Sequence, residues 1–431
     1  MSSQRRHIVP DPIAGSIELP TWLVKIIDEP AIRRMLFIRQ LGLKAYVDFP
    51  GAIHTRYSHA LGTMYFARKI TDMLAQKMYD KGKRILAENL SLNKEILMAA
   101  GFLHDIAHGP FSHAVDFAMK KITGKTHQAL AEDIITKEIS SDLENWVDKK
   151  QVVKLIQRNH DYPFLSQIIN GPIDIDKLDY LLRDAHHVGL RYSFDIDYFL
   201  NSYTILGDED NLSKCKLGLE NNQQAIVTTE LFLVMWKSMY DLVYHIQNSR
   251  IAEKMLEKAI LLKKDASQVI EKFKETKSFL ELYDDNLLRM LIDSKGRSEK
   301  LVSDIKGNKV YRVLVDVELN QENFQMSPKF LASLDDENEL SDFLSLELNK
   351  QYNQAEYQYI CDIVTGKAPS EIHMDEIDSD TSEYVDLRRK SNIVGAIQSV
   401  RRLKVYVDPT LCDIPSPEII NSKIKEIVEG I

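Results

Sequence analysis

The stretch Phe102-Leu-His-Asp-Ile-Ala-His-Gly-Pro-Phe-Ser-His113 is the most informative part of this chain. It places His104, Asp105, His108 and His113 within ten residues, directly after an apolar helical segment. The adjacent His104-Asp105 pair offers a divalent metal one neutral imidazole and one carboxylate. The two further histidines are suited to carry protons or to contact phosphate oxygens. This combination predicts metal-assisted hydrolysis of a phosphate ester.

The composition is that of an ordinary globular protein. The chain has 431 residues, of which 44% are hydrophobic and 28% charged, enough for a substantial core. A net charge of −9 argues against broad electrostatic attraction to nucleic acid. The cysteines lack metal-ligand spacing, and the N-terminus lacks the apolar core of a signal peptide. No window reaches the ~20 apolar residues of a membrane helix, so we expect a cytoplasmic protein.

The pattern of apolar residues predicts a mostly α-helical fold with a smaller C-terminal α+β lobe. Proline and glycine in residues 1–20 indicate an irregular or hairpin-like lead-in. Helical spacing follows in segments 21–41, 59–81, 94–108, 127–139, 149–158, 176–186, 226–262 and 265–282. After residue 285 we expect strands at 309–319 and 405–407, a helix near 335–346 and an acidic exposed loop over 371–383. The predicted division is a helical core, residues 1–285, and a lobe, residues 286–431.

Four positions in chain order are candidate metal ligands. They are His59, His104, Asp105 and one aspartate of the segment Asp174-Ile-Asp-Lys-Leu-Asp-Tyr-Leu-Leu-Arg-Asp184. A packed histidine is the ordinary alternative for His59 alone, and the His104-Asp105 dipeptide is short and common. Their joint occurrence beside apolar helices favours a metal site, because helices that converge in a bundle can bring such ligands together.

The aspartate segment offers more than one ligand. Asp176, Tyr180 and Asp184 are four residues apart and share one helical face. Asp179 and Arg183 share another, displaced face, and such an i, i+4 pair stabilises an exposed charged helix without any functional role. Spacing alone therefore leaves the choice of ligand open.

Several long motifs occur in order along the chain: Asp11–Leu19, Ile38–Gly42, Thr55–Gly62, His104–His113 and Ile175–His187. Together they resemble the HD-domain phosphohydrolases, in particular their deoxynucleoside triphosphate (dNTP) triphosphohydrolase branch. The resemblance covers roughly residues 8–260 and implies an HD-domain helical core.

This resemblance implies a role for each candidate residue. The metal ligands would be His59, His104, Asp105 and Asp176, holding one divalent ion per subunit, with Mg, Mn, Fe, Co, Ni and Zn all open. Phosphate oxygens would be contacted by Arg56, His108 and Lys177. The deoxyribose would be held by Gln40, Tyr180 and Asp184. A catalytic histidine–aspartate–histidine group beside the α-phosphate would comprise His113, Asp116 and His127.

The implied reaction is attack of water on the α-phosphorus of a dNTP, which releases a deoxynucleoside and intact triphosphate. Ile246 and Gln247 stand where the family has basic or histidine contacts, which favours an alternative nucleotide such as a monophosphate. A non-catalytic nucleotide-responsive module is a third interpretation. The family's activator site is not reproduced, because Asp28 is matched but Leu36 and His7 replace basic residues. The resemblance also implies a homo-oligomer, dimeric or tetrameric, and a regulatory nucleotide.

Overall fold

A short hairpin begins the computed structural model, which describes residues 7–320, 322–324, 327–379 and 383–430. Strands β1 (Ile8–Asp11) and β2 (Gly15–Glu18) pair antiparallel, and the Asp11 carboxylate accepts hydrogen bonds from the backbone N–H groups of Ile13 and Ala14 in the turn. The hairpin-like lead-in is therefore confirmed. Its turn directs Asp11 toward the helical core, where it takes part in the site described below.

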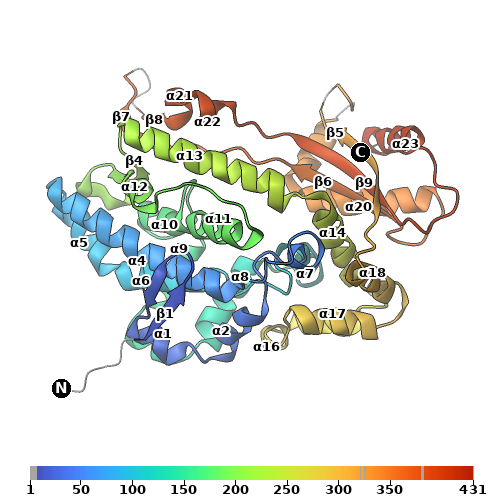
Figure 1. Ribbon diagram of the computed structural model, residues 1–431, viewed down its shortest axis with the longest axis horizontal. Coiled ribbons are helices and arrows are strands. Elements are labelled where there is room, and N and C mark those ends of the chain that lie inside the picture. The colour runs from blue at the N-terminus through green and yellow to red at the C-terminus, as the bar shows by residue number, and fades with distance from the viewer. Residues whose placement is uncertain (1–6, 321, 325–326, 380–382, 431) are drawn as a thin grey trace.

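One long helix organises the core. Helix α4 (Arg56–Asp80) starts at a capping box in which Thr55 and Ser58 bond each other's backbone. It packs against α5 (Arg84–Leu92), α6 (Lys94–Leu103) and α11 (Ile175–Val188). These helices lie together at the left and centre of Figure 1. The expectation of a mostly helical core is confirmed.

Several expected helices are shorter than the apolar spacing predicts. Segment 21–41 is divided into α1 (Thr21–Ile26) and α2 (Pro30–Arg34), since Pro30 cannot continue a helix and starts a new one. Segment 226–262 is divided into α13 (Gln223–Met239), the π-helical turn η5 (Tyr240–Tyr244) and α14 (Gln247–Leu261). Helix α6 ends at Leu103, so His104 to Ser112 form a loop.

The other helices complete the core. In chain order they are α3 (Lys44–Val47), α7 (His113–Thr123), α8 (His127–Asp133), the π-helical turn η2 (Ile134–Glu138), α9 (Lys149–Ile156), α10 (Pro163–Asn170), α12 (Ile196–Leu200), α15 (Ser267–Lys274), α16 (Thr276–Phe279), α17 (Asp284–Asp293) and α18 (Gly296–Lys306). The buried side chains of α17 and α18 belong to the same apolar cluster as those of α4. The division at residue 285 stays a prediction.

A three-stranded antiparallel sheet forms the centre of the C-terminal α+β lobe. Its order is β5 (Arg312–Glu318), β9 (Arg401–Val407), β6 (Tyr359–Thr365), and α20 (Glu337–Gln351) and α23 (Pro417–Glu429) lie beside it at the right of Figure 1. Both expected strands and the expected helix near 335–346 are confirmed.

A second sheet contains a strand where we expected a loop. Its order is β3 (Tyr203–Leu206), β4 (Lys216–Leu219), β7 (His373–Ile377), β8 (Tyr384–Asp386). The exposed acidic loop predicted over 371–383 is wrong for β7, because Ile372 and Met374 are buried and Met374 pairs with Leu219 of β4. Residues 380–382 of that segment lie outside the described residues.

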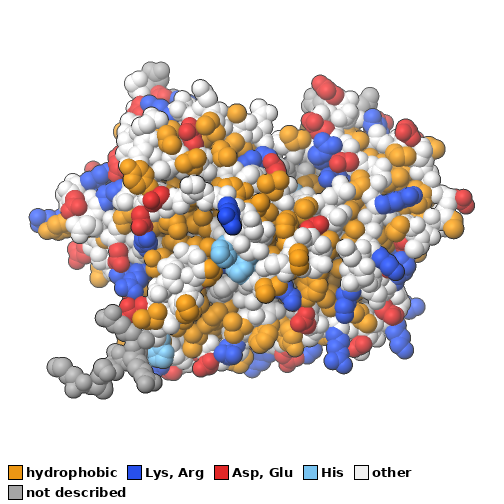
Figure 2. Space-filling view, in the orientation of Figure 1, with side chains coloured by type: hydrophobic (Ala, Val, Ile, Leu, Met, Phe, Trp, Pro, Cys, Tyr) orange, Lys and Arg blue, Asp and Glu red, His pale blue; other side chains and the backbone are white. Residues whose placement is uncertain are grey.

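Charged side chains of both signs are interspersed on the face drawn in Figure 2. Among the described residues, none of the helices is both long and apolar enough to cross a membrane.

Candidate metal centre and active site

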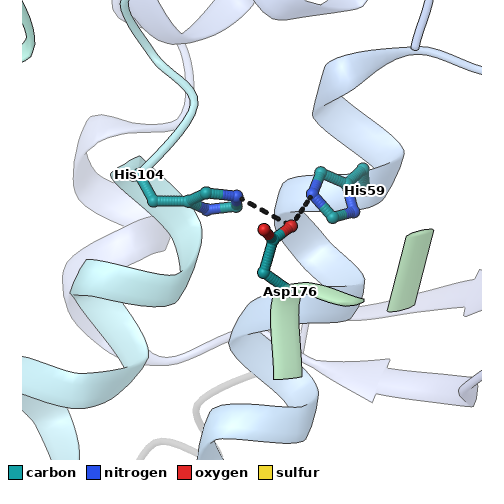
Figure 3. A group of neighbouring side chains, drawn as sticks. All are labelled: His59, His104 and Asp176. Atoms are coloured by element: carbon teal, nitrogen blue, oxygen red, sulfur yellow. Dashed lines mark ion pairs between the residues drawn. The ribbon is translucent and has the colours of Figure 1, made fainter. Parts of the chain in front are cut away.

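Three helices bring the candidate ligands together. His59 lies in the second turn of α4, His104 and Asp105 directly follow α6, and Asp176 lies in the first turn of α11. Oδ1 of Asp176 is 3.1 Å from Nε2 of His59 and 3.4 Å from Nε2 of His104. Figure 3 shows both imidazole rings directed toward this carboxylate.

Asp105 closes the group from the side of the loop. Its Oδ1 lies 3.3 Å from Nε2 of His104, and its Oδ2 lies 3.5 Å from Nε2 of His59. Burial raises the pKa of the Asp105 carboxyl, but Arg56 and the neighbouring histidines outweigh burial and hold that pKa well below its usual range. Asp105 is therefore a carboxylate at neutral pH, as a metal ligand must be.

The hydrogen bonds of the two imidazoles leave one nitrogen of each free for a metal. Nδ1 of His59 lies 2.8 Å from Asp179, and Nδ1 of His104 lies 2.8 Å from the carbonyl oxygen of Gly101. Both Nε2 atoms are buried without a hydrogen-bond partner. A ligating histidine ordinarily donates its other N–H in this way. The two nitrogens and two carboxylates fit a divalent metal, and this donor set leaves several metals possible.

Protons and a metal would compete for this group. Burial lowers the pKa of His59, but the neighbouring carboxylates of Asp176 and Asp179 outweigh burial and raise that pKa to about 10. His104 and His59 in turn hold the pKa of Asp176 below its usual range, against the effect of burial. The carboxylates thus stabilise positive charge at this position, and a divalent ion would supply that charge when it displaces the protons.

A buried ion network supports His59, and sequence reasoning missed it. Asp179 accepts hydrogen bonds from Arg183 at 2.8 and 2.9 Å, and Arg183 also binds Asp11 of the N-terminal hairpin at 2.7 Å. A Cβ atom on Gly62 of α4 would lie 1.8 Å from the Asp179 carboxylate. Only glycine allows this approach of α11 to α4. The i, i+4 spacing of Asp179 and Arg183 was visible in the sequence, but it equally fitted an exposed pair.

The second histidine group lies beside the first. Nδ1 of His113 is 3.1 Å from Asp116, and Nδ1 of His108 is 3.6 Å from the same carboxylate. The rings of His108 and His127 stack with centroids 5.0 Å apart. Burial and the positive charge of His108 lower the pKa of His127. The three residues expected beside the α-phosphate therefore lie together with His108, which was expected to contact a phosphate oxygen. The roles of all four stay predictions.

A strained loop connects the two groups. Phe111 and Ser112 have φ angles of 56° and 52°, a conformation that costs a non-glycine residue about 1–3 kcal/mol. The Phe111 N–H donates to Asp284 at 2.7 Å, and the Ser112 hydroxyl accepts a hydrogen bond from Arg56 at 2.9 Å. These contacts hold the loop so that α7 begins at His113.

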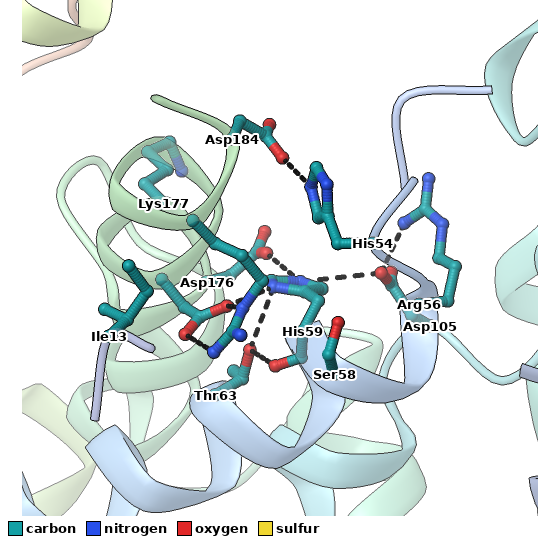
Figure 4. Close-up of polar contacts among 12 residues, drawn as sticks. Ile13, His54, Arg56, Ser58, His59, Thr63, Asp105, Asp176, Lys177 and Asp184 are labelled. Atoms are coloured by element: carbon teal, nitrogen blue, oxygen red, sulfur yellow. Dashed lines mark hydrogen bonds and ion pairs between the residues drawn. The ribbon is translucent and has the colours of Figure 1, made fainter. Parts of the chain in front are cut away.

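The expected sugar-binding residues form a third group. Asp184 is buried, with Oδ1 2.7 Å from Nε2 of His54 and Oδ2 accepting a hydrogen bond from Tyr244 at 2.8 Å. Figure 4 shows His54 directed toward Asp184. Oε1 of Gln40 is buried without a hydrogen-bond partner. His54 directly precedes the Thr55–Gly62 motif. Because it is far from Asp184 along the chain, nothing in the sequence indicated that the two side chains meet.

A cavity of about 680 Å³ joins the three groups, and a ligand of nucleotide size needs a space of this order. Its walls include Gln40, Arg56, His104, Asp105, His108, His113, Asp116, His127, Asp176, Lys177, Tyr180 and Asp184. Ile246 and Gln247 are not among the residues that line it. Positive charge instead comes from Lys44, Arg250, Lys254 and Lys367, of which the last belongs to the C-terminal lobe.

Comparison with known families agrees with this geometry. A family model of the HD domain matches residues 56–184, and a model of an HD associated region matches residues 211–413. The chain is an HD-domain protein. Its HD domain begins at the first residue of α4 and ends at Asp184, so it contains all four candidate metal ligands.

The HD-domain protein also matches curated relatives. An uncharacterized protein of Methanocaldococcus jannaschii is 33% identical over 59% of this chain and 49% of that protein. The deoxynucleoside triphosphate triphosphohydrolase SAMHD1 of Homo sapiens is 26% identical over 81% of this chain and 63% of the human protein. A homolog of SAMHD1 from Dictyostelium discoideum is 25% identical over 77% of this chain and 64% of its own. The chain thus spans about half to two thirds of the length of these relatives.

A solved structure has the same fold. The crystal structure of a hypothetical protein from Aquifex aeolicus superposes with a TM-score of 0.71 at 23% sequence identity. The match covers 98% of this chain and 99% of that one, so the likeness extends from the HD domain through the C-terminal lobe.

Proposed function

We propose that this HD-domain protein hydrolyses deoxynucleoside triphosphates to deoxynucleoside and triphosphate in a metal-dependent reaction, by attack of water on the α-phosphorus. One observation carries the proposal: three of the four candidate ligands, the histidine–aspartate group and the buried pair Gln40 and Asp184 line one cavity. The fourth ligand, His59, is buried directly behind that wall, 3.1 Å from Asp176. The relatives named as dNTP triphosphohydrolases support this choice of substrate.

In this proposal His59, His104, Asp105 and Asp176 hold the metal. When bound, a divalent ion would act as a Lewis acid on a phosphoryl oxygen and on water. Arg56 is buried beside Asp105 and Ser112, and its guanidinium stabilises the negative charge that grows on the phosphoryl oxygens. Lys177 lines the same cavity and contributes a second positive charge.

The second histidine group handles the proton. Attack on the α-phosphorus breaks its bond to O5′ of the nucleoside, and that oxygen must gain a proton as it leaves. His113 and His127 are the candidate donors, with Asp116 orienting the ring of His113 at 3.1 Å. His108, between Arg56 and Asp116, contacts a phosphate oxygen.

Discrimination of the sugar rests on buried polar atoms. The 3′-hydroxyl lies between the two side chains: it donates its hydrogen to the Asp184 carboxylate and accepts a hydrogen bond from the amide of Gln40. An additional 2′-hydroxyl without a partner would cost a few kcal/mol in this buried setting. The site therefore favours deoxyribonucleotides over ribonucleotides.

The test is product analysis across a panel of dNTPs and ribonucleotides with Mn²⁺ or Mg²⁺, with metal content measured on the same sample. We expect deoxynucleoside and triphosphate in equal amounts, and no turnover from His59→Ala or Asp105→Ala. Asp197→Asn, at an exposed position on α12, is the control variant. The proposal fails if no dNTP yields a deoxynucleoside, with or without added nucleotides as activators.

A second candidate is hydrolysis of another nucleotide, such as a monophosphate, by the same HD site. It is favoured by the far wall of the cavity, where three cations are already paired: Lys44 with Glu253, Arg250 with Asp362 and Lys254 with Glu257. Paired cations attract a long phosphate chain less strongly than free ones. Release of inorganic phosphate from monophosphates, with dNTPs inert, would select this candidate.

We propose a cytoplasmic homo-oligomer, dimeric or tetrameric, with one divalent ion in each subunit. A regulatory nucleotide is a further element of the proposal, and light scattering with and without each dNTP would test both.

A further inference from the structure

A second cavity lies next to the catalytic one. It has a volume of about 470 Å³ and is bounded by α10, by Phe232 and Trp236 of α13, and by residues 368–370 of the lobe. We call it the side pocket. Arg158, Asn170 and Lys177 line both cavities, so the two spaces meet at these residues.

The charge of the side pocket differs from that of the catalytic cavity. Among the residues that the structure describes, no aspartate or glutamate lines the side pocket, whereas Arg158 and Lys177 both do. Two hydrogens of the Lys177 ammonium are directed to the Gly171 carbonyl at 2.9 Å and to Asp174 at 2.5 Å. Because an ammonium has three donors, one is left for a ligand.

Two buried donors in the side pocket have no partner. Nε1 of Trp236 and Oγ of Ser166 are without hydrogen bonds, and these residues are only 6% and 4% exposed. An unpaired buried donor costs about 1–3 kcal/mol, and native proteins seldom retain one without a function. Because Trp236 and Ser166 both line the side pocket, a ligand that accepts hydrogen bonds there would supply the missing partners.

The amide side chains in the wall offer a ligand little in addition. The Gln167 oxygen accepts the N–H of Leu217 at 2.7 Å. The Asn170 oxygen accepts from Arg158 at 2.9 Å, and its nitrogen donates to the Ile156 carbonyl at 3.1 Å. A nucleobase would require both free donors and free acceptors. The free groups here are mainly donors, accompanied by positive charge, which is the pattern that suits an oxyanion.

We propose that the side pocket binds an oxyanion of the phosphate class, held by Trp236, Ser166, Arg158 and Lys177. The anion is either the distal phosphate of the nucleotide in the catalytic cavity or a free inorganic phosphate chain. The binding itself rests on the geometry of the side pocket and not on the proposed reaction.

The experiment measures binding of inorganic triphosphate to the full chain by calorimetry, after EDTA treatment and without any turnover. Trp236→Phe keeps the packing of the ring but removes its N–H, and Ser166→Ala removes the hydroxyl. Each variant is expected to weaken the side-pocket binding about tenfold, since a hydrogen bond to a charged group is lost. Trp146→Phe, at an exposed position outside the cavity, is the matched control and is expected to bind as the natural protein does.

Measurements of KM and turnover then distinguish the two possible sources of the anion. If the side pocket holds the distal phosphate of the substrate, Trp236→Phe raises KM for a triphosphate and leaves KM for a monophosphate unchanged. If it holds a free anion, KM is unchanged in Trp236→Phe, and the response of turnover to added triphosphate is lost.

The proposal is overturned if Trp236→Phe and Ser166→Ala, both folded by circular dichroism, bind triphosphate as tightly as the Trp146→Phe control. Binding weakened without any nucleotide hydrolysis would support the side pocket and refute the proposed function alone.

Discussion

The carboxylate of Asp179 lies 2.8 Å from Nδ1 of His59, on the side of the ring opposite to Asp176. His59 and Asp179 are fully buried, and Arg183 donates a hydrogen bond to the Asp179 carboxylate. Asp179 therefore fixes the tautomer in which Nδ1 carries the hydrogen and Nε2 presents its lone pair to the candidate metal position.

Asp179→Asn is expected to weaken metal binding about 10- to 100-fold, because the amide cannot stabilise this tautomer as a carboxylate does. Metal titration of the purified variant measures the affinity, and thermal unfolding measures its stability. Asp11→Asn is the matched control, since it removes the other carboxylate of Arg183 without touching His59. Equal losses of metal affinity in the two variants would mean that Asp179 acts through folding and not through His59.

The hydroxyl of Tyr244 is expected to position Asp184. Tyr244→Phe removes the 2.8 Å hydrogen bond to Oδ2 but keeps the aromatic ring beside Tyr180. We expect kcat/KM for the dNTP substrate to fall about tenfold, which corresponds to about 1.4 kcal/mol. Tyr192→Phe, which loses a comparable 2.8 Å hydrogen bond to Ser238, should keep kcat/KM. An unchanged kcat/KM in Tyr244→Phe would remove Tyr244 from the site.

The sequence predicted the parts of the site that depend on local order. His104 and Asp105 are adjacent, and Asp176, Tyr180 and Asp184 recur at helical spacing, so their grouping required only that a helix form. Spacing alone could not show whether Asp176 or Asp179 is the metal ligand. That choice depends on how α11 rotates against α4, and the close contact at Gly62 sets this rotation.

The fold was predictable to a similar degree. Apolar spacing identified most core helices, but it joined α13 to α14 across η5, because a π-helical turn preserves apolar contacts while it shifts their register. Strand β7 was mistaken for a loop because it has only five residues, of which Asp375 and Glu376 are acidic and Met374 alone is buried.

His245 is expected to reduce stability as the pH falls. Burial and the cations Arg250, Lys44 and Lys367 lower its pKa to about 4, against the opposing effect of Asp362. The unfolded chain takes up a proton below pH 6.5, and the folded protein does not until about pH 4. The contribution of His245 to the free energy of unfolding is thus fully present above pH 6.5. It is lost as the pH falls from 6.5 to 4, which lowers the free energy of unfolding by up to about 3 kcal/mol.

Urea unfolding of His245→Gln at several pH values tests this expectation. The variant should lose less stability than the natural protein between pH 6.5 and 4, because its amide takes up no proton in either state. His373→Gln on β7 is the control and should follow the natural protein. Parallel curves for all three proteins would show that His245 is not responsible.

Asp342 is expected to join the lobe to the helical core. From α20 it binds Lys258 of α14 at 2.8 Å and Lys121 of α7 at 2.5 Å, and both Asp342 and Lys258 are buried. Asp342→Asn leaves the Lys258 ammonium with Glu257 as its nearest charge, at 2.7 Å. Loss of one partner from a buried pair costs about 3–5 kcal/mol, which denaturant unfolding would measure.

Asp336→Asn is the matched control for this loss. Asp336 pairs with the exposed Lys120 at 2.7 Å, and surface pairs contribute about 0–1 kcal/mol. Asparagine also retains the hydrogen bond to the Glu339 N–H that caps α20. The double variant Lys258→Met with Asp342→Leu should cost less than Asp342→Asn, because both charges of the pair are removed and Glu257 keeps Lys254 at 2.9 Å. A loss in Asp342→Asn no larger than in Asp336→Asn would contradict the role of this ion pair in joining the lobe to the core.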